Sequence, residues 1–467
     1  MRGTFDVGAW GEPMDGTVAD RRLNILAVLS LFVVGCGHTP TAQPTGEQSH
    51  VSLPADGSIA ITNVTLVDVA SGARETAVTV VTKAGLIADI GRGISIPREM
   101  VRVDGAGKFL IPGLWDMHSH HQATGGEALD LFLASGVVGT RDMGADLEFI
   151  LPLRERINRG ELLGPEIVAS GPILDDAPPE FPFRRRVTSA EEAREAVRDL
   201  KARGVDFIKV HDHTPREAYF AIAEEAPKLG LPFAGHVPIT VTVEEAADSG
   251  IKSIEHLANF RVFTECSPEG AYSAVRCQPR FDKLAAKGIW QTPTMAFFRA
   301  LPEAFSGQPL PHAEYASDAL LKLTRQNAEA SKLDEQALLS IRNLSKASLA
   351  AIHDLHSRGS RFLAGCDGLV PGFCLEDELQ LMTDAGFSPL QAIQTATINA
   401  AKFLGREKTQ GTIEVGKRAD LVLLEADPLT DINNLRRIAA VLVRGRLLSR
   451  ADIDRIISAH RRTLPNP

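Results

Sequence analysis

Short apolar or alternating segments occupy both ends of the chain. Residues 58–110 contain IAITNVTLVDV, AVTVVTKAGLIADIG and KFLIPG, separated by Gly and Asp turns. The same pattern of short apolar segments occurs near the C-terminus, in GTIEVGKRADLVLLEADP and RIAAVLVRGRLL. This pattern is typical of antiparallel strands. We therefore predict one small β-sandwich domain built from residues 58–113 and 411–450, followed by a C-terminal tail, residues 451–467.

The middle of the chain has a different pattern of apolar and polar residues. Between residues 114 and 410, short apolar strands alternate with helical patterns such as SAEEAREAVRDLKARG. Such alternation predicts an α/β fold with parallel strands, and eight strands is the number in a TIM (β/α)8 barrel. Segment 300–345, before the last strand, is expected to cover the barrel mouth. The predicted strands lie in WDMHSH, VVGTRDMG, EIVASGPIL, DFIKVHDH, FAGHVP, SIEHLA, IWQTPTMAFF and RFLAGCDG.

The N-terminal region predicts export. Two arginines precede the apolar run LNILAVLSLFVV, which has the length of a signal-peptide core and is too short to span a membrane. Cys36 follows a small residue, as at a bacterial lipoprotein cleavage site. We expect residues 1–36 to be a signal peptide with lipidation at Cys36, and residues 37–57 to be a flexible tether. This places the protein in the periplasm or on the outer membrane; an ordinary secretory signal is the alternative.

The remaining cysteines are interpreted in that light. In an oxidising compartment, a disulfide between Cys266 and Cys277 would close the segment TECSPEGAYSAVRC. Cys366 and Cys374 are expected to be a buried thiol and an unpaired neighbour. The sequence has no CxxC pair that would indicate a thiolate zinc site.

Composition limits the partners. The chain has 50 Lys+Arg and 59 Asp+Glu, a formal charge of −9, and no basic block. A nucleic-acid partner is therefore excluded, because such proteins carry clustered positive charge. We expect a small-molecule or dipeptide substrate, membrane contact only through the lipid anchor, and a chain that could form a homo-oligomer.

Polar residues gather at the C-terminal ends of the predicted strands, where barrel enzymes place their chemistry. The two histidines of the HSH pair point the same way, because residues i and i+2 share one face of a strand. One such histidine could be structural, but the whole set predicts a metal site. Its members are His118, His120, Lys209, His236, His256 and Asp367.

Lys209 lies in the apolar segment FIKV. Burial disfavours its ammonium form, so the side chain should lose its proton or find an acidic partner. A neutral amine can add to CO₂, and the resulting carbamate is an anionic ligand able to bridge two cations. A salt bridge inside the barrel is the alternative.

These motifs together resemble the amidohydrolase superfamily, in its prolidase-like and imidazolonepropionase-like branch. The resemblance covers roughly residues 58–447 and implies a distorted TIM barrel with a small β-sandwich from both chain ends. The matching segments are IPGLWDMHSH, GVVGTRDMG, FIKV, GHVP, IEHL, AGCDG, ATINAAKFLG and GTIEVGKRADLVLLEADPL.

The resemblance also implies roles for the site residues. His118, His120 and Asp367 would hold one divalent ion, His236 and His256 a second, and a carboxylated Lys209 would bridge them. A hydroxide shared by the two ions would attack an amide carbonyl, with Asp367 as the catalytic proton shuttle. Zinc is the expected metal, with manganese or cobalt as alternatives. Xaa-Pro dipeptides or N-acyl amino acids would be the substrates.

Other polar residues receive smaller roles. His211 stands where many prolidase-like relatives carry a tyrosine, which makes it a candidate for binding a substrate carboxylate. Arg141 and His213 are expected to point toward the barrel mouth, Arg141 as a second substrate-binding candidate. His121 and Asp142 are expected to be structural, and His353 and His356 to be a surface or packing pair.

Two further interpretations stay open. One is a mononuclear hydrolase of cyclic amides or lactones in which Lys209 is unmodified. The other is a non-catalytic envelope binding protein, which should lack some ligands, whereas the full set is present in this chain.

Overall fold

The computed structural model describes residues 58–126, 128–177, 183–267, 272–331, 333–368 and 370–463. The predicted leader, the tether and Cys36 lie outside these residues. Within them, none of the helices combines the length and apolar character that crossing a membrane requires.

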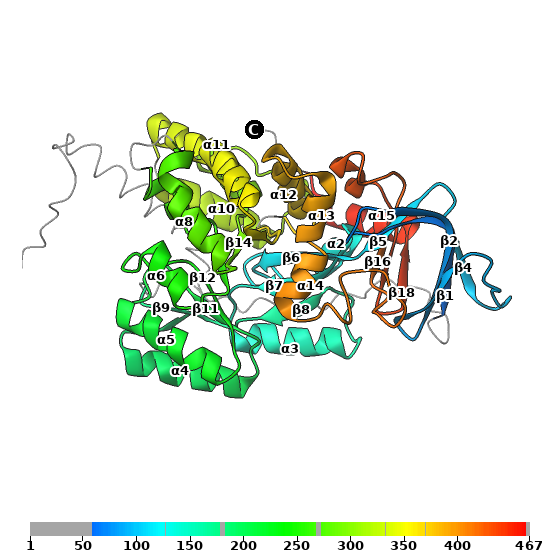
Figure 1. The fold of residues 1–467 in the computed structure, drawn as a ribbon, viewed down its shortest axis with the longest axis horizontal. Coiled ribbons are helices and arrows are strands. Elements are labelled where there is room, and N and C mark those ends of the chain that lie inside the picture. Colours follow the sequence, from blue (N-terminus) through cyan, green and yellow to red (C-terminus); the bar gives the residue numbers. More distant parts are fainter. Residues whose placement is uncertain are drawn as a thin grey trace, which may run out of the picture.

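The two chain ends build one sheet of eight strands, in the order β18-β17-β16-β5-β1-β2-β3, with β4 beside β1 (Figure 1). β5 joins the two ends, because it is parallel to β1 and antiparallel to β16, with Leu421 opposite Pro112. β1 pairs with both β4 and β5 along one edge, so the β unit is a branched sheet. Its strands are β1 (Ile59–Val67), β2 (Arg74–Lys83), β3 (Leu86–Gly91), β4 (Val101–Asp104), β5 (Phe109–Pro112), β16 (Leu421–Leu424), β17 (Ile438–Val443) and β18 (Arg446–Ser449).

All eight predicted barrel segments contain a strand. The barrel is distorted, because these parallel strands belong to two sheets, β6-β7-β8 and β10-β9-β11-β12-β13-β14-β15. The third predicted segment splits into two strands, β8 (Glu166–Ala169) and β9 (Ile173–Asp175), and β10 (Arg184–Arg186) was not predicted. The remaining strands are β6 (Leu114–Ser119), β7 (Val137–Asp142), β11 (Ile208–Val210), β12 (Phe233–Gly235), β13 (Ser253–Glu255), β14 (Trp290–Thr292) and β15 (Arg361–Phe362).

Backbone hydrogen bonds connect the end of β15 to β6. Met117 N donates to Ala364 O at 2.9 Å, and Asp367 N donates to His118 O at 2.7 Å. This approach requires glycine at position 365, because a Cβ there would lie 2.6 Å from the Cβ of His118. The last strand therefore delivers Asp367 directly to the histidine pair of the first.

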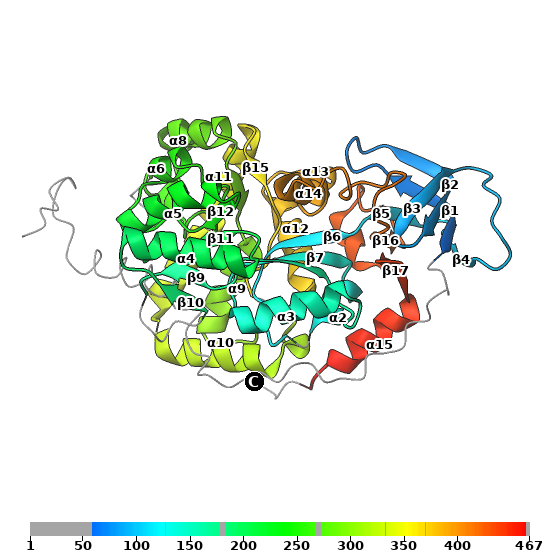
Figure 2. The ribbon, with the colours of Figure 1, turned by 90° about the horizontal axis from the view of Figure 1, so that it is seen from below.

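Helices follow most barrel strands (Figure 2). In α4 the Ser189 hydroxyl accepts from Glu192 N at the start, and Gly204 ends the helix in a left-handed conformation. Its apolar face, including Leu200, is buried. The helices are α2 (Leu129–Ala134), α3 (Leu147–Asn158), α4 (Ala190–Arg203), α5 (Arg216–Lys228), α6 (Val243–Asp248), α7 (Arg261–Thr264), α8 (Ala274–Ala286), α9 (Met295–Phe305), α10 (Asp318–Ser331), α11 (Glu335–Ser357), α12 (Phe373–Asp384), α13 (Pro389–Thr395), α14 (Ile398–Leu404) and α15 (Arg450–His460).

The segment expected to cover the barrel mouth is mostly helical. It contains the end of α9, the 3-10 turn η2 (Ala313–Tyr315), α10 and the start of α11. α9 packs against α10, α11 and α12 and buries most of its side chains, including Phe297 and Phe298. This part of the segment is a packed layer. The tail helix α15 lies against α2, where His460 Nε2 and Asp130 Oδ1 are 2.8 Å apart.

The four described cysteines form two disulfides. Cys266 is joined to Cys277, as the sequence suggested. The expectation for Cys366 and Cys374 was wrong, because the structure joins them as well, with 5.7 Å between their Cα atoms. This pair was missed because the Gly/Pro-containing turn between the two cysteines was read as keeping them apart, whereas it brings the start of α12 back to Cys366.

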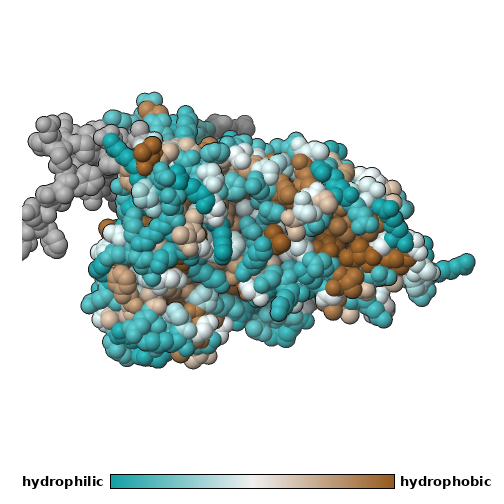
Figure 3. All heavy atoms as spheres, in the orientation of Figure 1, coloured by the Kyte–Doolittle hydropathy of each residue, from teal (hydrophilic) through white to brown (hydrophobic). Residues whose placement is uncertain are grey.

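The surface is mostly polar, with a larger apolar area over the β sheet (Figure 3). Leu86, Val101 and Val415 are large hydrophobic residues that remain exposed in this part of the chain.

Candidate metal centre

The first group of predicted ligands lies together at the ends of β6 and β15. His118 Nε2 is 3.2 Å and His120 Nε2 is 3.4 Å from Asp367 Oδ1. The three residues form one of the clusters whose ligand atoms are close enough to share a metal ion. The i, i+2 spacing in β6 therefore places both imidazoles beside one carboxylate, as predicted.

The second group lies beside the first. The rings of His236 and His256 are 4.7 Å apart, and the ring of His256 is 4.5 Å from that of His118. His256 Nδ1 is 3.6 Å from Asp367 Oδ2, so the aspartate faces both groups. His118, His120 and His256 thus contact one carboxylate, Asp367 after β15, and His236 after β12 lies beside His256.

Each of these histidines has its Nδ1 engaged. His118 Nδ1 lies 3.0 Å from Glu255 Oε2, and His120 Nδ1 lies 3.2 Å from Gly144 O. His236 Nδ1 contacts Asp212 Oδ1 at 2.9 Å, and His256 Nδ1 contacts Thr294 Oγ1 at 2.7 Å. Partners of this kind fix ring orientation and leave Nε2 as the metal-binding atom.

One observation tests whether the residues fit a metal. His118 Nε2 is buried and, although Asp367 Oδ1 lies 3.2 Å away, it makes no hydrogen bond of good geometry among the described residues. An unpartnered buried ring nitrogen is costly unless it binds something. Because Asp367 and His120 lie beside it, a divalent cation matches the donor set of imidazole nitrogens and a carboxylate.

The protonation states also suit a metal. Burial lowers the pKa of His236 and lowers that of His256 well below its ordinary value, so both rings are neutral near pH 7. Burial alone would raise the pKa of Asp367, but the neighbouring His256 and His118 hold it well below its usual range. The aspartate is therefore an anionic ligand.

Lys209 lies on β11, opposite Ala234 of the neighbouring strand β12, with 1% of its surface exposed. Burial lowers its pKa to about 8, although Glu255 and Asp367 favour the charged form. A Cβ at position 235 would lie 3.1 Å from Lys209 Cδ, so Gly235 leaves room for the chain. A substantial neutral fraction near pH 8 is what carbamate formation needs.

An unusual backbone turn carries His256. Residues 256–260 all have positive φ angles, between 46° and 68°, although none is glycine. A left-handed conformation costs roughly 1–2 kcal/mol per residue, and such strain concentrates at functional sites. The turn also delivers Asn259, whose Nδ2 donates to Asp212 Oδ2 at 2.9 Å and so supports His236.

Several supporting residues were missed from the sequence. Glu255, Asp212, Asn259 and Thr294 orient the histidine rings, yet none was singled out. Glu255 and Asp212 are each adjacent to a predicted site residue, His256 and His211 respectively. The signal that could have found them is an acidic residue next to a predicted site residue in an otherwise apolar segment. Such an acid is expected to be buried, and a buried acid needs a partner.

The structure corrects the expectation for Arg141. Its side chain is fully buried and donates to Ser253 Oγ, at the start of β13, so it points away from the C-terminal ends of the strands. Its Nη2 pairs with Glu255 Oε2 at 2.9 Å, and its Nε donates to Met117 O at 2.6 Å. The guanidinium also lies over the ring of Phe403, at 4.8 Å. This geometry makes Arg141 the counter-ion of the Glu255–His118 pair.

His211 lies at the site. Its ring stacks on His236 at 3.8 Å, and the two form a second metal-competent cluster with Asp212. Burial lowers the pKa of His211 well below its ordinary value, so the ring is neutral and can offer a hydrogen bond. His213, two residues further on, is exposed.

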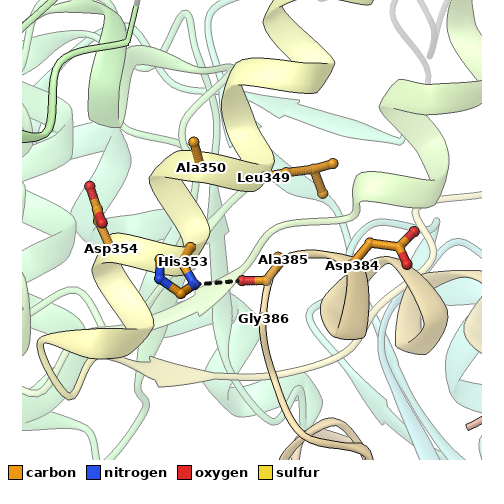
Figure 4. Close-up of a pocket in the computed structure, with 7 residues that line it drawn as sticks. All are labelled: Leu349, Ala350, His353, Asp354, Asp384, Ala385 and Gly386. Atoms are coloured by element: carbon orange, nitrogen blue, oxygen red, sulfur yellow. Dashed lines mark hydrogen bonds between the residues drawn. The ribbon is translucent and has the colours of Figure 1, made fainter.

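The residues expected to be structural have structural contacts. His121 Nε2 contacts Thr140 Oγ1 at 2.8 Å, and Asp142 Oδ2 accepts from His121 N at the same distance. His356 stacks on Phe387 at 3.8 Å. His353 lines a surface hollow between α11 and the end of α12 and points to Ala385 O, while Asp354 and Asp384 point elsewhere (Figure 4).

A parallel-strand barrel with these ligands at the C-terminal strand ends defines a metal-dependent hydrolase. The chain belongs to the amidohydrolase family, whose model matches residues 109–448. As a member of this family, the chain is a hydrolase that acts on carbon–nitrogen bonds. Members of the family generally bind divalent metals, and the ligand cluster described above is where this chain would do so.

Individual relatives agree with this assignment. An imidazolonepropionase from Vibrio cholerae is 22% identical over 397 residues, which cover 79% of this chain and 92% of the relative. A Xaa-Pro dipeptidase structure with bound methionine has a TM-score of 0.66 and 22% identity, covering 84% of this chain and all of the other. A bottromycin amidohydrolase has a TM-score of 0.69 and 21% identity, covering 93% and 96%. These two structures share the fold of this chain.

Proposed function

We propose that this protein is a binuclear metallohydrolase that cleaves an amide bond in Xaa-Pro dipeptides or N-acyl amino acids. The observation that carries the proposal is the contact of three histidines with Asp367, with His236 beside His256 and with the buried Lys209 close enough to interact with the aspartate. The fold shared with a Xaa-Pro dipeptidase supports the choice of substrate class.

In this proposal the residues divide into two ligand sets. His118, His120 and Asp367 would hold one ion, His236 and His256 would hold the other, and Lys209, if carboxylated, would supply an anionic oxygen ligand to the pair. Zinc, or alternatively manganese or cobalt, would supply Lewis acidity, which lowers the pKa of water and polarises the scissile carbonyl. Imidazole and carboxylate donors suit all three metals.

The chain's own side chains perform the proton transfer and the orientation. Asp367, ionised and facing both ligand sets, takes the proton of the attacking water and passes it to the leaving amine. Glu255, Asp212 and Thr294 keep the imidazoles in place. His211, neutral and stacked on His236, donates a hydrogen bond to the substrate carboxylate.

A screen with a matched pair of variants tests the proposal. Purified protein is analysed for metal and assayed with dipeptides, N-acyl amino acids and lactones. We expect more than one divalent ion per chain, and Asp367→Asn should lower kcat by roughly 100-fold or more, because general acid–base catalysis contributes that much. Asp384→Asn, an exposed aspartate beside the surface hollow, should leave kcat unchanged. Substantially less than one ion per chain, or equal turnover by Asp367→Asn, would refute the proposal.

The second candidate is a mononuclear hydrolase of cyclic amides or lactones with Lys209 unmodified. The imidazolonepropionase relative, which matches most of this chain, favours it. One ion per chain together with lactone or cyclic-amide turnover would select this candidate.

Export and lipidation at Cys36 complete the proposal. The two disulfides support it, because such bonds persist in oxidising compartments. The residues concerned, 1–57, lie outside the described part of the chain.

A further inference from the structure

The Cys366–Cys374 disulfide lies directly beside Asp367. Cys366 is the residue before Asp367, and Cys374 is in the first turn of α12. Both cysteines are 2% exposed. The crosslink therefore closes the loop after β15 at the point where the metal-binding carboxylate leaves the strand.

Asp367 needs to be held, because its backbone is left-handed, with φ at 58°. A non-glycine residue keeps this conformation only where its surroundings enforce it. On the upstream side, Asp367 N donates to His118 O at 2.7 Å, and Cys366 N donates to Asp116 Oδ1 at 3.1 Å. Asp116 Oδ1 also accepts from His118 N at 3.0 Å, so one buried carboxylate links β6 to the aspartate.

On the downstream side, the loop is fixed where α12 begins. A Cβ at Gly372 would lie 2.5 Å from Ser135 Oγ, so the chain passes tightly against the end of α2. The ring of Phe373 stacks on Tyr315 at 4.7 Å and on His312 at 5.2 Å. The disulfide is the covalent connection between this fixed helix start and the strained aspartate.

We propose that Cys374 is a positioning residue for Asp367, acting through the disulfide, and that the metal centre is complete only in the oxidised protein. The inference rests on the proposed function. Reduction by a phosphine breaks the S–S bond: the two sulfurs take two electrons and two protons, and the phosphine takes the oxygen of water to become a phosphine oxide. The released loop then lets Asp367 relax out of its left-handed conformation.

The test compares two double variants of the full chain. Cys366→Ala/Cys374→Ala removes this crosslink, and Cys266→Ala/Cys277→Ala removes the other, which touches no ligand of the metal centre. Hydrogen exchange of the peptide containing Asp367 gives a readout that depends on neither metal nor substrate. Metal loss to a chelator and the separate kcat and KM values are measured on the same samples.

We expect the Cys366/Cys374 variant to exchange its Asp367 peptide roughly 10-fold faster and to lose metal and kcat by a similar factor, with KM nearly unchanged, as positioning residues of metal ligands do. The Cys266/Cys277 variant should match the wild type at that peptide. Phosphine reduction of the wild type should reproduce the loss of metal and kcat, and reoxidation should restore both. This experiment replaces the Cys366/Cys374 variant if that variant does not fold.

Unchanged exchange, metal retention and kcat in the Cys366/Cys374 variant would overturn the inference, as would an equal loss in the Cys266/Cys277 variant. Absence of metal and turnover from the wild type is a different result. It refutes the proposed function, while the exchange experiment still decides whether the disulfide holds Asp367.

Discussion

At the scale of single residues, the centre depends on buried charges that neutralise one another. Glu255 has no exposed surface and contacts both His118 Nδ1 and Arg141 Nη2. Burial by itself would raise the pKa of Glu255, but Arg141 and His118 hold it well below its ordinary value. Arg141 is therefore the main group that keeps this buried carboxylate ionised and able to orient His118.

Replacement of Arg141 tests this dependence. Arg141→Met should lower the free energy of unfolding by about 3 kcal/mol, because it removes the guanidinium that pairs directly with the buried charge of Glu255. It should lower metal affinity as well, through His118. Urea unfolding and metal titration measure the two effects. Arg203→Met, at the exposed pair with Glu148, should cost less than about 1 kcal/mol. A rise in KM alone, with stability intact, would instead place Arg141 in substrate binding.

The ligands could be predicted from the sequence because each follows from its place on a strand. The HSH spacing and the ends of β11, β12 and β13 fix where those side chains point. Asn259 and Thr294 could not be predicted, since their contacts with Asp212 and His256 depend on how the turns after β13 and β14 fold onto neighbouring strands. The direction of Arg141 was also wrongly predicted. The sequence around an arginine near the end of a strand is the same whether its side chain points out of the barrel or into its interior.

At the scale of elements, α12 supports α9, which borders the metal centre. Thr294, the residue before α9, uses its hydroxyl for His256 Nδ1 and makes no side-chain cap bond to the helix. Glu378 of α12 supplies the cap, since its Oε2 accepts from Ala296 N at 2.8 Å. Burial raises the pKa of Glu378 to about 8.

This raised pKa predicts a pH dependence. The native state keeps a proton on Glu378 up to about pH 8, whereas the unfolded chain releases it near 4.5. The contribution to stability is therefore complete below about pH 4.5 and is lost as the pH rises through 8. The free energy of unfolding of the wild type minus that of Glu378→Gln should fall by a few kcal/mol between pH 5 and pH 8.

Urea unfolding of the two proteins across this range measures the difference. Asp384→Asn, at the exposed end of the same helix, serves as the control for general effects of removing a carboxyl group. A difference that stays constant with pH would show that Glu378 carries the same protonation in the native and unfolded states over this interval, so that burial does not raise its pKa and its role is hydrogen bonding alone.

At the scale of the whole molecule, the two ends of the barrel have different roles: one carries the metal centre, and the other contacts the β sheet. The ligands come from the C-terminal ends of the strands, while Glu166 begins β8 at the other end. The eight-strand alternation and the composite β unit could both be predicted, because hydrophobic periodicity reports which elements form. The separation into two sheets and the extra strand β10 could not, since they depend on how distant strands meet.

Glu166 connects the barrel to the β sheet. Its Oε1 pairs with Arg406 Nη1 at 2.5 Å, and its Oε2 pairs with Arg418. Arg418 Nη2 in turn lies 2.6 Å from Asp420 Oδ2, just before β16. These partly exposed charges form a network, which contributes more than an isolated surface pair.

Removal of Glu166 should therefore weaken the whole molecule without changing its chemistry. We expect Glu166→Gln to lower the free energy of unfolding by roughly 1–2 kcal/mol, because two arginines lose their shared carboxylate. Metal content and kcat below the unfolding temperature should remain those of the wild type, since the metal centre lies at the opposite strand ends. Glu161→Gln, at an exposed pair with Arg159, should leave the free energy of unfolding nearly unchanged. A loss of metal or kcat in Glu166→Gln, with the fold intact, would show that the contact between barrel and sheet sets the geometry of the metal centre.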